Sequence, residues 1–364
     1  MARTPNYLRD YDELYRRDPR AAAKQWFRDA RYGLFMHYGL YSMLGRHEWV
    51  QCHERIRPDA YAQLADHFTA DRFDAEAIAD FAAACGMRYL NITTRHHDSF
   101  CLFESKQTRF NSVDAAPCGR DLVGELAAAC DARRLGLFLY YSHGRDWKHP
   151  HAPNNDGYGG AARPEFDPPE PTYATGAAHD LTLYLRFMTE QITELLTRYD
   201  HPIAGIWLDG IGVPLHPRNE RGEVIEDYDP RSDGDPFELQ QLYDHIHQLS
   251  PYALVSYKQG YLGTEDFFAP EHKAYNRFGE SFADRLGEVC TTAGGGWGYT
   301  AGSAYCSADE VWKKLAEAGS NRCNLLMNVG PMPDGSLPVD ATATLREAGR
   351  RIAAEGMPGG VEPA

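Results

Sequence analysis

Two acidic residues of the sequence lie where carboxylates could do chemistry. Asp209 ends the apolar run Ile206-Trp207-Leu208, and Gly210 follows it. An ionised carboxylate at the mouth of a buried strand costs free energy unless it is partnered or used, although a cap on the next loop is the equally simple interpretation. Glu271 follows in the acidic segment 264–271 and could supply a second carboxylate. Retaining glycosidases need such a pair, about 5 Å apart, whereas many acidic loops are only solvated.

Histidines also follow predicted strands, at His37 and at His96-His97. Adjacent side chains on a strand point to opposite faces, so both His96 and His97 reach one pocket only if the chain turns there. A metal site of His37, His96 or His97 and Asp209 is one interpretation, and a buried histidine with satisfied nitrogens is another. Because these candidate ligands include no closely spaced pair such as H-x-H, we expect no metal and favour imidazoles that bind hydroxyl groups.

Glu48-Trp49 pairs a hydrogen-bond acceptor with an aromatic side chain. This pair suits a sugar ring, which has hydroxyls and an apolar C–H face, although a tryptophan packed on a helix is the simple alternative. The sequence has no P-loop, no G-x-S-x-G and no dinucleotide-binding glycine motif. Gly294-Gly295-Gly296 leads to Trp297 and not to a helix, which argues against a phosphate site. No cofactor is expected.

The elements that must position these residues alternate between helices and strands. Helical spacing with capping residues predicts helices over 74–85, 121–134, 181–199, 237–249, 309–318 and 341–353. Short apolar runs predict strands over 33–38, 87–94, 137–142, 203–209, 253–257 and 323–329, with two more near 267 and 289. This order favours a (β/α)₈ barrel, with an open doubly wound sheet as the alternative. In a barrel the carboxyl ends of all strands meet at one face, where catalytic residues lie.

Composition and charge exclude several classes of protein. The 364 residues are 43% hydrophobic and 24% charged, as in a globular chain. A net charge of −15 disfavours nucleic acid and anionic membranes as partners. We expect a cytoplasmic protein with reduced thiols, because the sequence shows no signal peptide, no long apolar run and no C-x-x-C pair among its 8 cysteines. The segment 149–175, rich in Pro and Gly, is expected to form a lid or a disordered insertion.

Taken together, these residues resemble the α-L-fucosidases of glycoside hydrolase family 29. The matching segments are WFRDARYGLFMHYG (26–39), EW (48–49), TTRHHDSF (93–100), YYS (140–142) with DW (146–147), WLDG (207–210), EDFFAPE (265–271), WGY (297–299) and NLLMNVGP (324–331). They occur in collinear order from about residue 24 to about residue 350. The resemblance implies a (β/α)₈-like domain and retaining hydrolysis of terminal α-L-fucosides.

The resemblance also implies roles for individual residues. Asp209 corresponds to the nucleophile and Glu271 to the general acid/base, with Glu288 in reserve because the family places its acid/base less uniformly. The residues implied to bind the substrate are His37, Glu48, Trp49, His96, His97, Tyr141, Lys258 and Trp297. Tyr38 stands where the family usually has Trp, and Lys258 where some members have Arg, so substrate detail is expected to differ.

The implied organisation is one catalytic domain. We expect an N-terminal extension over 1–23, a (β/α)₈-like domain over 24–355 and a tail over 356–364, without the C-terminal β-sandwich of many members. A homo-oligomer contact could cover the surface that the β-sandwich would occupy. The implied partner is a fucosylated oligosaccharide or glycoconjugate. Two alternatives stay open: a non-catalytic protein that binds fucose or glycans, and a glycosidase for a related sugar such as an α-L-galactoside.

Overall fold

The computed structural model describes residues 3–155, 162–209, 237–258, 264–272 and 286–359, and the side chains of 257 and 258 lie outside this part. Eight parallel strands form a closed barrel in sequence order, with β8 paired to β1. The strands are β1 (Tyr32–Met36), β2 (Tyr89–Arg95), β3 (Gly136–Ser142), β4 (Gly205–Asp209), β5 (Leu254–Lys258), β6 (Phe267–Ala269), β7 (Leu286–Thr292) and β8 (Cys323–Asn328). The predicted (β/α)₈ barrel is confirmed, and the open sheet is excluded.

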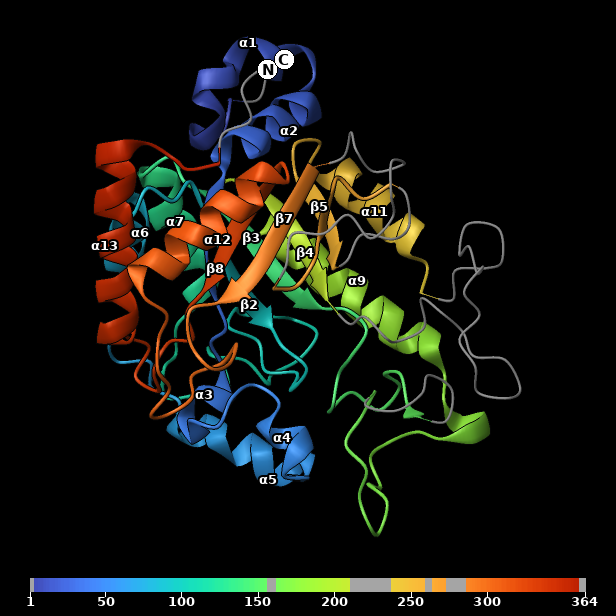
Figure 1. Ribbon diagram of the computed structural model, residues 1–364. Coiled ribbons are helices and arrows are strands. Elements are labelled where there is room, and N and C mark those ends of the chain that lie inside the picture. The colour runs from blue at the N-terminus through green and yellow to red at the C-terminus, as the bar shows by residue number, and fades with distance from the viewer. Residues whose placement is uncertain (1–2, 156–161, 210–236, 259–263, 273–285, 360–364) are drawn as a thin grey trace, which may run out of the picture.

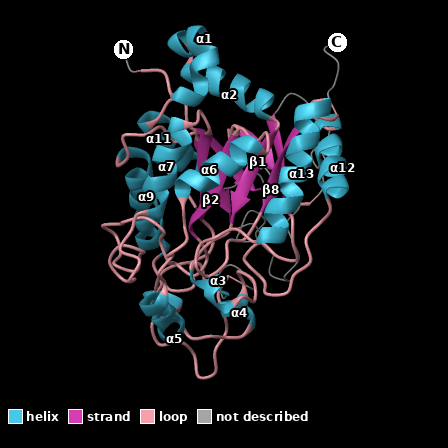
Figure 2. Ribbon diagram, turned by 90° about the vertical axis from the view of Figure 1, so that its left-hand side faces the viewer, coloured by secondary structure: helices cyan, strands magenta, loops and turns pink. Residues whose placement is uncertain are grey.

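Helices surround the barrel, and short helices lie at its two ends (Figures 1 and 2). The helices are η1 (Asn6–Tyr11), α1 (Asp12–Arg17), α2 (Pro19–Ala30), α3 (Leu40–Leu44), α4 (Val50–His53), α5 (Pro58–Ala62), η2 (Gln63–His67), α6 (Ala75–Ala84), α7 (Leu122–Ala132), η3 (Gly176–Ala178), α9 (Leu181–Thr197), α11 (Leu239–Leu249), α12 (Ala308–Ser320) and α13 (Val339–Glu355). All six predicted helices are present.

Side-chain caps fix where several outer helices begin. Asp74 and Asp121 each accept a hydrogen bond from the backbone N–H three residues later, at the start of α6 and α7. Ser307 and Glu310 form a reciprocal capping box at the start of α12. Such caps satisfy backbone donors that the first turn leaves without partners. The helices therefore begin at defined residues and carry the chain back to the next strand.

Helix α2 closes the amino-terminal end of the barrel. Its Trp26 and Phe27 are buried and pack against Phe138, with ring centroids 6.3 and 5.6 Å away. Gly136 makes room for this contact, because a Cβ there would lie 2.4 Å from the Trp26 ring. Helix α2 runs through the boundary predicted at residue 23.

The opposite end of the barrel carries α3, α4 and α5 (Figure 1). Glu48-Trp49 lies directly before α4, so these short helices place the pair above the carboxyl ends of the strands. Arg57, at the start of α5, forms an ion pair with Glu170 at 3.2 Å and lies 5.0 Å from the ring centroid of Phe166. The described parts of the segment 149–175 are therefore attached to this end, and a role as a lid stays a prediction.

All eight cysteines are unpaired. Within the described residues, no helix combines the length and the apolar character that crossing a membrane needs.

Candidate active site

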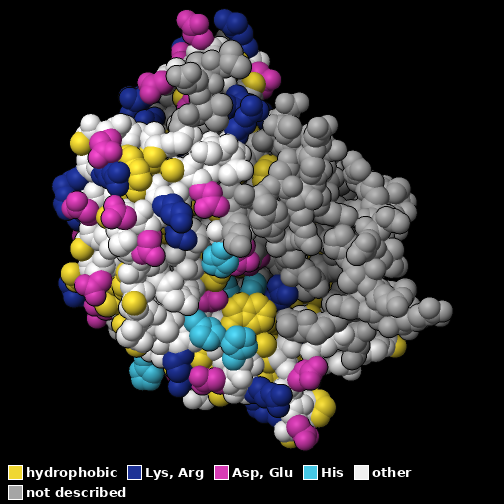
Figure 3. All heavy atoms as spheres, in the orientation of Figure 1, with side chains coloured by type: hydrophobic (Ala, Val, Ile, Leu, Met, Phe, Trp, Pro, Cys, Tyr) yellow, Lys and Arg dark blue, Asp and Glu magenta, His cyan; other side chains and the backbone are white. Residues whose placement is uncertain are grey.

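A cavity of about 300 Å³ lies at the carboxyl end of the barrel. Its volume is at the low end of the roughly 300–1,000 Å³ that is typical of ligand pockets, which suits one sugar ring better than several. Histidines gather around a hydrophobic patch on this face of the molecule (Figure 3). The lining residues are Phe35, His37, Glu48, Trp49, His96, His97, Tyr140, Arg145, Trp207, Asp209, Glu271, Cys290 and Trp297.

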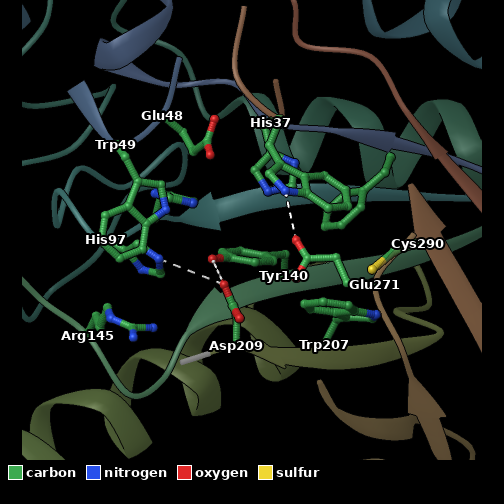
Figure 4. Close-up of a pocket in the computed structure, with 13 residues that line it drawn as sticks. His37, Glu48, Trp49, His97, Tyr140, Arg145, Trp207, Asp209, Glu271 and Cys290 are labelled. Atoms are coloured by element: carbon green, nitrogen blue, oxygen red, sulfur yellow. Dashed lines mark hydrogen bonds and ion pairs between the residues drawn. The ribbon is translucent and has the colours of Figure 1, made fainter. Parts of the chain in front are cut away.

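Asp209 is the last residue of β4 and lies deep in this cavity. Its side chain is 9% exposed, and its Oδ2 accepts a hydrogen bond of 2.6 Å from the Tyr140 hydroxyl. The same oxygen lies 3.9 Å from Nε2 of His97. Burial, followed by the charge of Asp209, raises the pKa of Tyr140 well above its usual value, so this hydroxyl stays a donor. Figure 4 shows these three side chains converging on one wall.

Glu271 lies beyond β6, nearer the mouth of the cavity. A bridge to Cys290 of β7 continues the parallel pairing past the end of β6 and thereby fixes the backbone. Its Oε1 accepts a hydrogen bond of 3.0 Å from the indole N–H of Trp297. The Glu271 side chain is 28% exposed, about three times as much as that of Asp209. The two carboxylates therefore face the same cavity from different environments, as a division between nucleophile and acid requires.

His96 and His97 both line the cavity because β2 ends at Arg95 and the chain turns there. Their ring centroids lie 4.1 Å apart. Nδ1 of His97 is 2.6 Å from the Ser142 hydroxyl, and Nδ1 of His37 is 2.7 Å from Oδ1 of Asn328. These contacts engage Nδ1 of His37 and His97 and fix the direction of both rings.

A buried ion pair behind the cavity holds His97 and the following loop in place. Arg95 donates to the Asp146 carboxylate and to the Ser142 carbonyl, and both charged side chains are fully buried. Burial opposes the negative charge of Asp146, but the Arg95 guanidinium outweighs it, so the pKa of Asp146 lies below its usual value. The backbone N–H of Trp147 then donates 2.7 Å to the His97 carbonyl. This network connects the chain after β2 to the chain after β3.

Glu48 and Trp49 complete one side of the cavity. Oε2 of Glu48 accepts a hydrogen bond of 2.8 Å from the backbone N–H of Gly298, which connects this loop to the one that carries Trp297. The indole of Trp49 packs edge to face on His97, with centroids 5.3 Å apart, and lies 5.3 Å from the Arg145 guanidinium. An acceptor and an aromatic face therefore border the same space, as predicted.

The prediction that Tyr141 contacts the substrate is wrong by one residue. Its hydroxyl donates 2.7 Å to Gln191 of α9, and the Arg95 guanidinium lies 4.4 Å from its ring centroid. Adjacent side chains of a strand point to opposite faces, so Tyr141 points outward to the helices while Tyr140 lines the cavity.

Glu288, the reserve acid/base, does not line the cavity but lies below its floor, inside the barrel. It is 1% exposed and accepts hydrogen bonds from the Tyr89 hydroxyl at 2.5 Å and from the Trp207 indole at 2.9 Å. Loss of solvation raises its pKa from 4.5 to about 7. Because Trp207 lies between it and the sugar-sized space, Glu288 is placed to support the floor and not to reach a substrate.

We expect Glu288→Gln to stabilise the protein at pH 8. A carboxyl whose pKa is raised on folding contributes stability at low pH and loses it as the pH rises from 4.5 through about 7. The difference between these two pKa values corresponds to a loss of about 3 kcal/mol of folding stability at pH 8. Glutamine does not ionise and therefore does not incur this loss. Urea unfolding of both proteins should show a gain of about 1–3 kcal/mol at pH 8 that shrinks towards pH 5. The same pH dependence for both proteins would contradict this assignment.

The structure brings eight of the ten predicted site residues to the cavity: His37, Glu48, Trp49, His96, His97, Asp209, Glu271 and Trp297. The side chain of Lys258 lies outside the described residues. Sequence reasoning missed Phe35, Tyr140, Arg145, Trp207 and Cys290. Phe35 and Trp207 precede His37 and Asp209 by two positions, and the two-residue period of a strand could have identified them. Arg145 follows β3 in a loop, where no period applies.

The arrangement suits carbohydrate chemistry. Two carboxylates face a space bordered by imidazoles, indoles and a phenol, which can bind hydroxyls and the apolar face of a sugar. Among the described residues, no three His, Cys, Asp or Glu side chains are grouped as metal ligands would be.

Comparisons with known proteins agree with this chemistry. The family model described as alpha-L-fucosidase matches residues 4–357. A plasma alpha-L-fucosidase of Rattus norvegicus is 27% identical over 369 residues, which cover 95% of this chain and 72% of the rat protein. A putative alpha-L-fucosidase of Caenorhabditis elegans is 26% identical, with 95% of this chain and 68% of the other covered.

Solved structures show the same similarity. Alpha-L-fucosidase isoenzyme 1 of Paenibacillus thiaminolyticus superimposes with a TM-score of 0.75 and 31% identity, covering 93% of this chain and 77% of that one. Alpha-L-fucosidase AlfC of Lactobacillus casei, in complex with its α-L-fucose product, gives a TM-score of 0.75 and 26% identity, covering 91% of this chain and 98% of that one.

Proposed function

This chain belongs to the alpha-L-fucosidase family of glycoside hydrolases, and we propose that it removes terminal α-L-fucose from fucosylated glycans by a retaining double displacement. Asp209 is the nucleophile and Glu271 is the general acid/base. The observation that carries this proposal is that both carboxylates line one cavity the size of a single sugar, the first deep within it and the second at its mouth. Among the described carboxylates that line the cavity, the one other candidate for either role is Glu48, which accepts a hydrogen bond from the backbone N–H of Gly298.

In the first step, a carboxylate oxygen of Asp209 attacks the anomeric carbon of the fucose. The bond from this carbon to the glycosidic oxygen breaks as Glu271 gives that oxygen its proton, and a fucosyl ester of Asp209 forms. The Tyr140 hydroxyl favours the ionised form of Asp209 because it donates a hydrogen bond to the carboxylate.

In the second step, the ionised Glu271 removes a proton from water. The water oxygen attacks the anomeric carbon, the ester bond breaks, and Asp209 regains its charge while fucose leaves with its original anomeric configuration. The greater exposure of Glu271 supports this role, because water must reach the acid/base residue but must not solvate the nucleophile.

The walls of the cavity suit a 6-deoxy sugar. Imidazoles of His37, His96 and His97 can exchange hydrogen bonds with ring hydroxyls, and the floor contributed by Phe35 and Trp207 is apolar. A methyl group in place of a hydroxymethyl group matches an apolar surface, which favours a fucoside over the corresponding galactoside. A hydroxyl added against such an apolar surface is expected to lower kcat/KM by roughly 10²-fold.

Kinetic assays with 4-nitrophenyl α-L-fucoside and 4-nitrophenyl α-L-galactoside test this function. We expect the fucoside to be hydrolysed with the higher kcat/KM, and NMR of the first product to show the α-anomer of L-fucose. Binding of fucose without turnover of any α-L-fucoside would instead favour a glycan-binding protein, and release of the β-anomer first would contradict double displacement.

A further inference from the structure

His272 follows Glu271 directly and lies at the mouth of the cavity. Its side chain is 53% exposed, and its backbone N–H donates 2.8 Å to the Cys290 carbonyl of β7. Its φ of 65° falls in the left-handed region, which few residues other than glycine adopt, although histidine adopts it more often than most. The His272 side chain therefore lies beside the candidate acid/base, with Nε2 close to its carboxylate.

Three contacts define the direction of the His272 imidazole. The ring stacks on Trp297, with centroids 5.5 Å apart and planes 29° apart. Nδ1 lies 3.3 Å from the Thr291 hydroxyl, and Nε2 lies 3.8 Å from Oε1 of Glu271. A separation of 3.8 Å is too long for a hydrogen bond, so within the described residues Nε2 has a charged neighbour but no hydrogen-bond partner. The edge of the ring that carries Nε2 therefore lies beside the carboxyl that must meet the glycosidic oxygen.

The position of the leaving group follows from the proposed function, on which this inference rests. Asp209 attacks one face of the anomeric carbon, and Glu271 protonates the oxygen on the other side. The group bonded to that oxygen must therefore lie on the side of Glu271. Since the cavity holds about one sugar, this group extends to the mouth, past the more exposed carboxyl. His272 is the neighbour of Glu271 there.

We propose that His272 is a specificity-determining residue that contacts the first sugar on the leaving-group side. Nε2 exchanges a hydrogen bond with a hydroxyl of that sugar, and the contacts with Trp297 and Thr291 hold the imidazole in this direction. Hydroxylated leaving groups are thereby preferred to small ones. A histidine that only supported Trp297 would affect all substrates alike, because Trp297 also packs on His37, with centroids 5.1 Å apart, inside the cavity.

His272→Asn separates these two roles. Asparagine tolerates the left-handed backbone and can keep the hydrogen bond to Thr291, but it lacks Nε2 and the stacked ring. The test compares kcat/KM for α-L-fucosyl fluoride, whose leaving group is too small to reach His272, with kcat/KM for the α-L-fucosyl disaccharide that the wild type cleaves fastest from a panel ending in N-acetylglucosamine or galactose. We expect a loss of roughly 5- to 20-fold for the disaccharide and less than about twofold for the fluoride.

His53→Ala is the matched control. His53 is also an exposed histidine stacked on a cavity tryptophan, with its centroid 5.7 Å from that of Trp49, but it follows a different loop and does not neighbour Glu271. This variant should keep the wild-type ratio of the two kcat/KM values. His272→Gly, which also tolerates the backbone, should reproduce the loss seen with asparagine.

The outcomes separate this inference from the proposed function. Equal losses on both substrates, no loss on the disaccharide, or the same loss in His53→Ala would overturn the role of His272 while fucoside hydrolysis stands. If the wild type hydrolyses neither the fluoride nor any disaccharide, the proposed function fails first.

Discussion

Replacing Asp209 by alanine is expected to lower kcat for 4-nitrophenyl α-L-fucoside by at least roughly 10³-fold, because no fucosyl ester can form. The cavity should keep its affinity for fucose, because Asp209 is not needed to hold the imidazoles of His37 and His97. Nδ1 of each is engaged by another side chain, Asn328 and Ser142 respectively. Initial rates and fucose binding by calorimetry measure the two quantities separately. Asp200→Ala, at an exposed position after α9, is the control and should behave as the wild type.

Rescue by azide distinguishes the loss of a nucleophile in Asp209→Ala from a general loss of structure. The space left by the missing carboxylate lets azide attack the anomeric carbon directly, so Asp209→Ala should regain turnover and give β-L-fucosyl azide, with inverted configuration. A variant that keeps more than a tenth of the wild-type rate, or a folded variant that azide does not rescue on any aryl fucoside, would count against Asp209 as the nucleophile.

Glu271→Gln is expected to have the second largest effect, and one that depends on the leaving group. For a fucosyl disaccharide, whose alkoxide leaves poorly, kcat/KM should fall by roughly 10²- to 10⁴-fold, because general acid catalysis contributes about that much. For 2,4-dinitrophenyl α-L-fucoside, whose leaving group needs no proton, kcat/KM should change little. The glutamine can still accept the hydrogen bond from Trp297, so the loop should keep its place.

The product formed with azide also identifies the role of Glu271. In Glu271→Gln the ester of Asp209 still forms, and azide attacks it to give α-L-fucosyl azide, with retained configuration. The two variants should therefore give opposite anomers from the same reagent. Equal losses on both leaving groups in Glu271→Gln, or the β-azide from it, would assign the acid/base role elsewhere.

The sequence predicted the barrel and most of the site because both depend on short-range patterns. Strands such as 137–142 are apolar runs after helices with clear periodicity, and the closed barrel then requires their carboxyl ends to meet. Asp209 ends such a run, and His37 and the pair His96-His97 follow one, which is why the sequence places them at the carboxyl end of the barrel.

The features that the sequence could not predict are the direction in which a strand side chain points and its depth within the barrel. The run 137–142 has no polar alternation, so nothing in it distinguishes Tyr140, which faces the barrel interior, from Tyr141, which faces α9. Glu288 and Glu271 are both acidic residues near predicted strands, and only the register of β7 shows that Glu288 lies beneath Trp207. Helix α2 closes the barrel through contacts between distant segments, which local patterns do not reveal.

Mass spectrometry of the enzyme inactivated by 2-deoxy-2-fluoro-α-L-fucosyl fluoride identifies the carboxylate that forms the covalent ester. The fluorine at C2 slows both steps, and the activated leaving group keeps the first one fast enough for an ester to accumulate. After proteolysis, one fluorofucosyl group should be found on the peptide that contains Asp209, and prior incubation with fucose should protect it. Label on any other carboxylate, or inactivation and turnover with no covalent adduct, would contradict the assignment of Asp209 as the nucleophile.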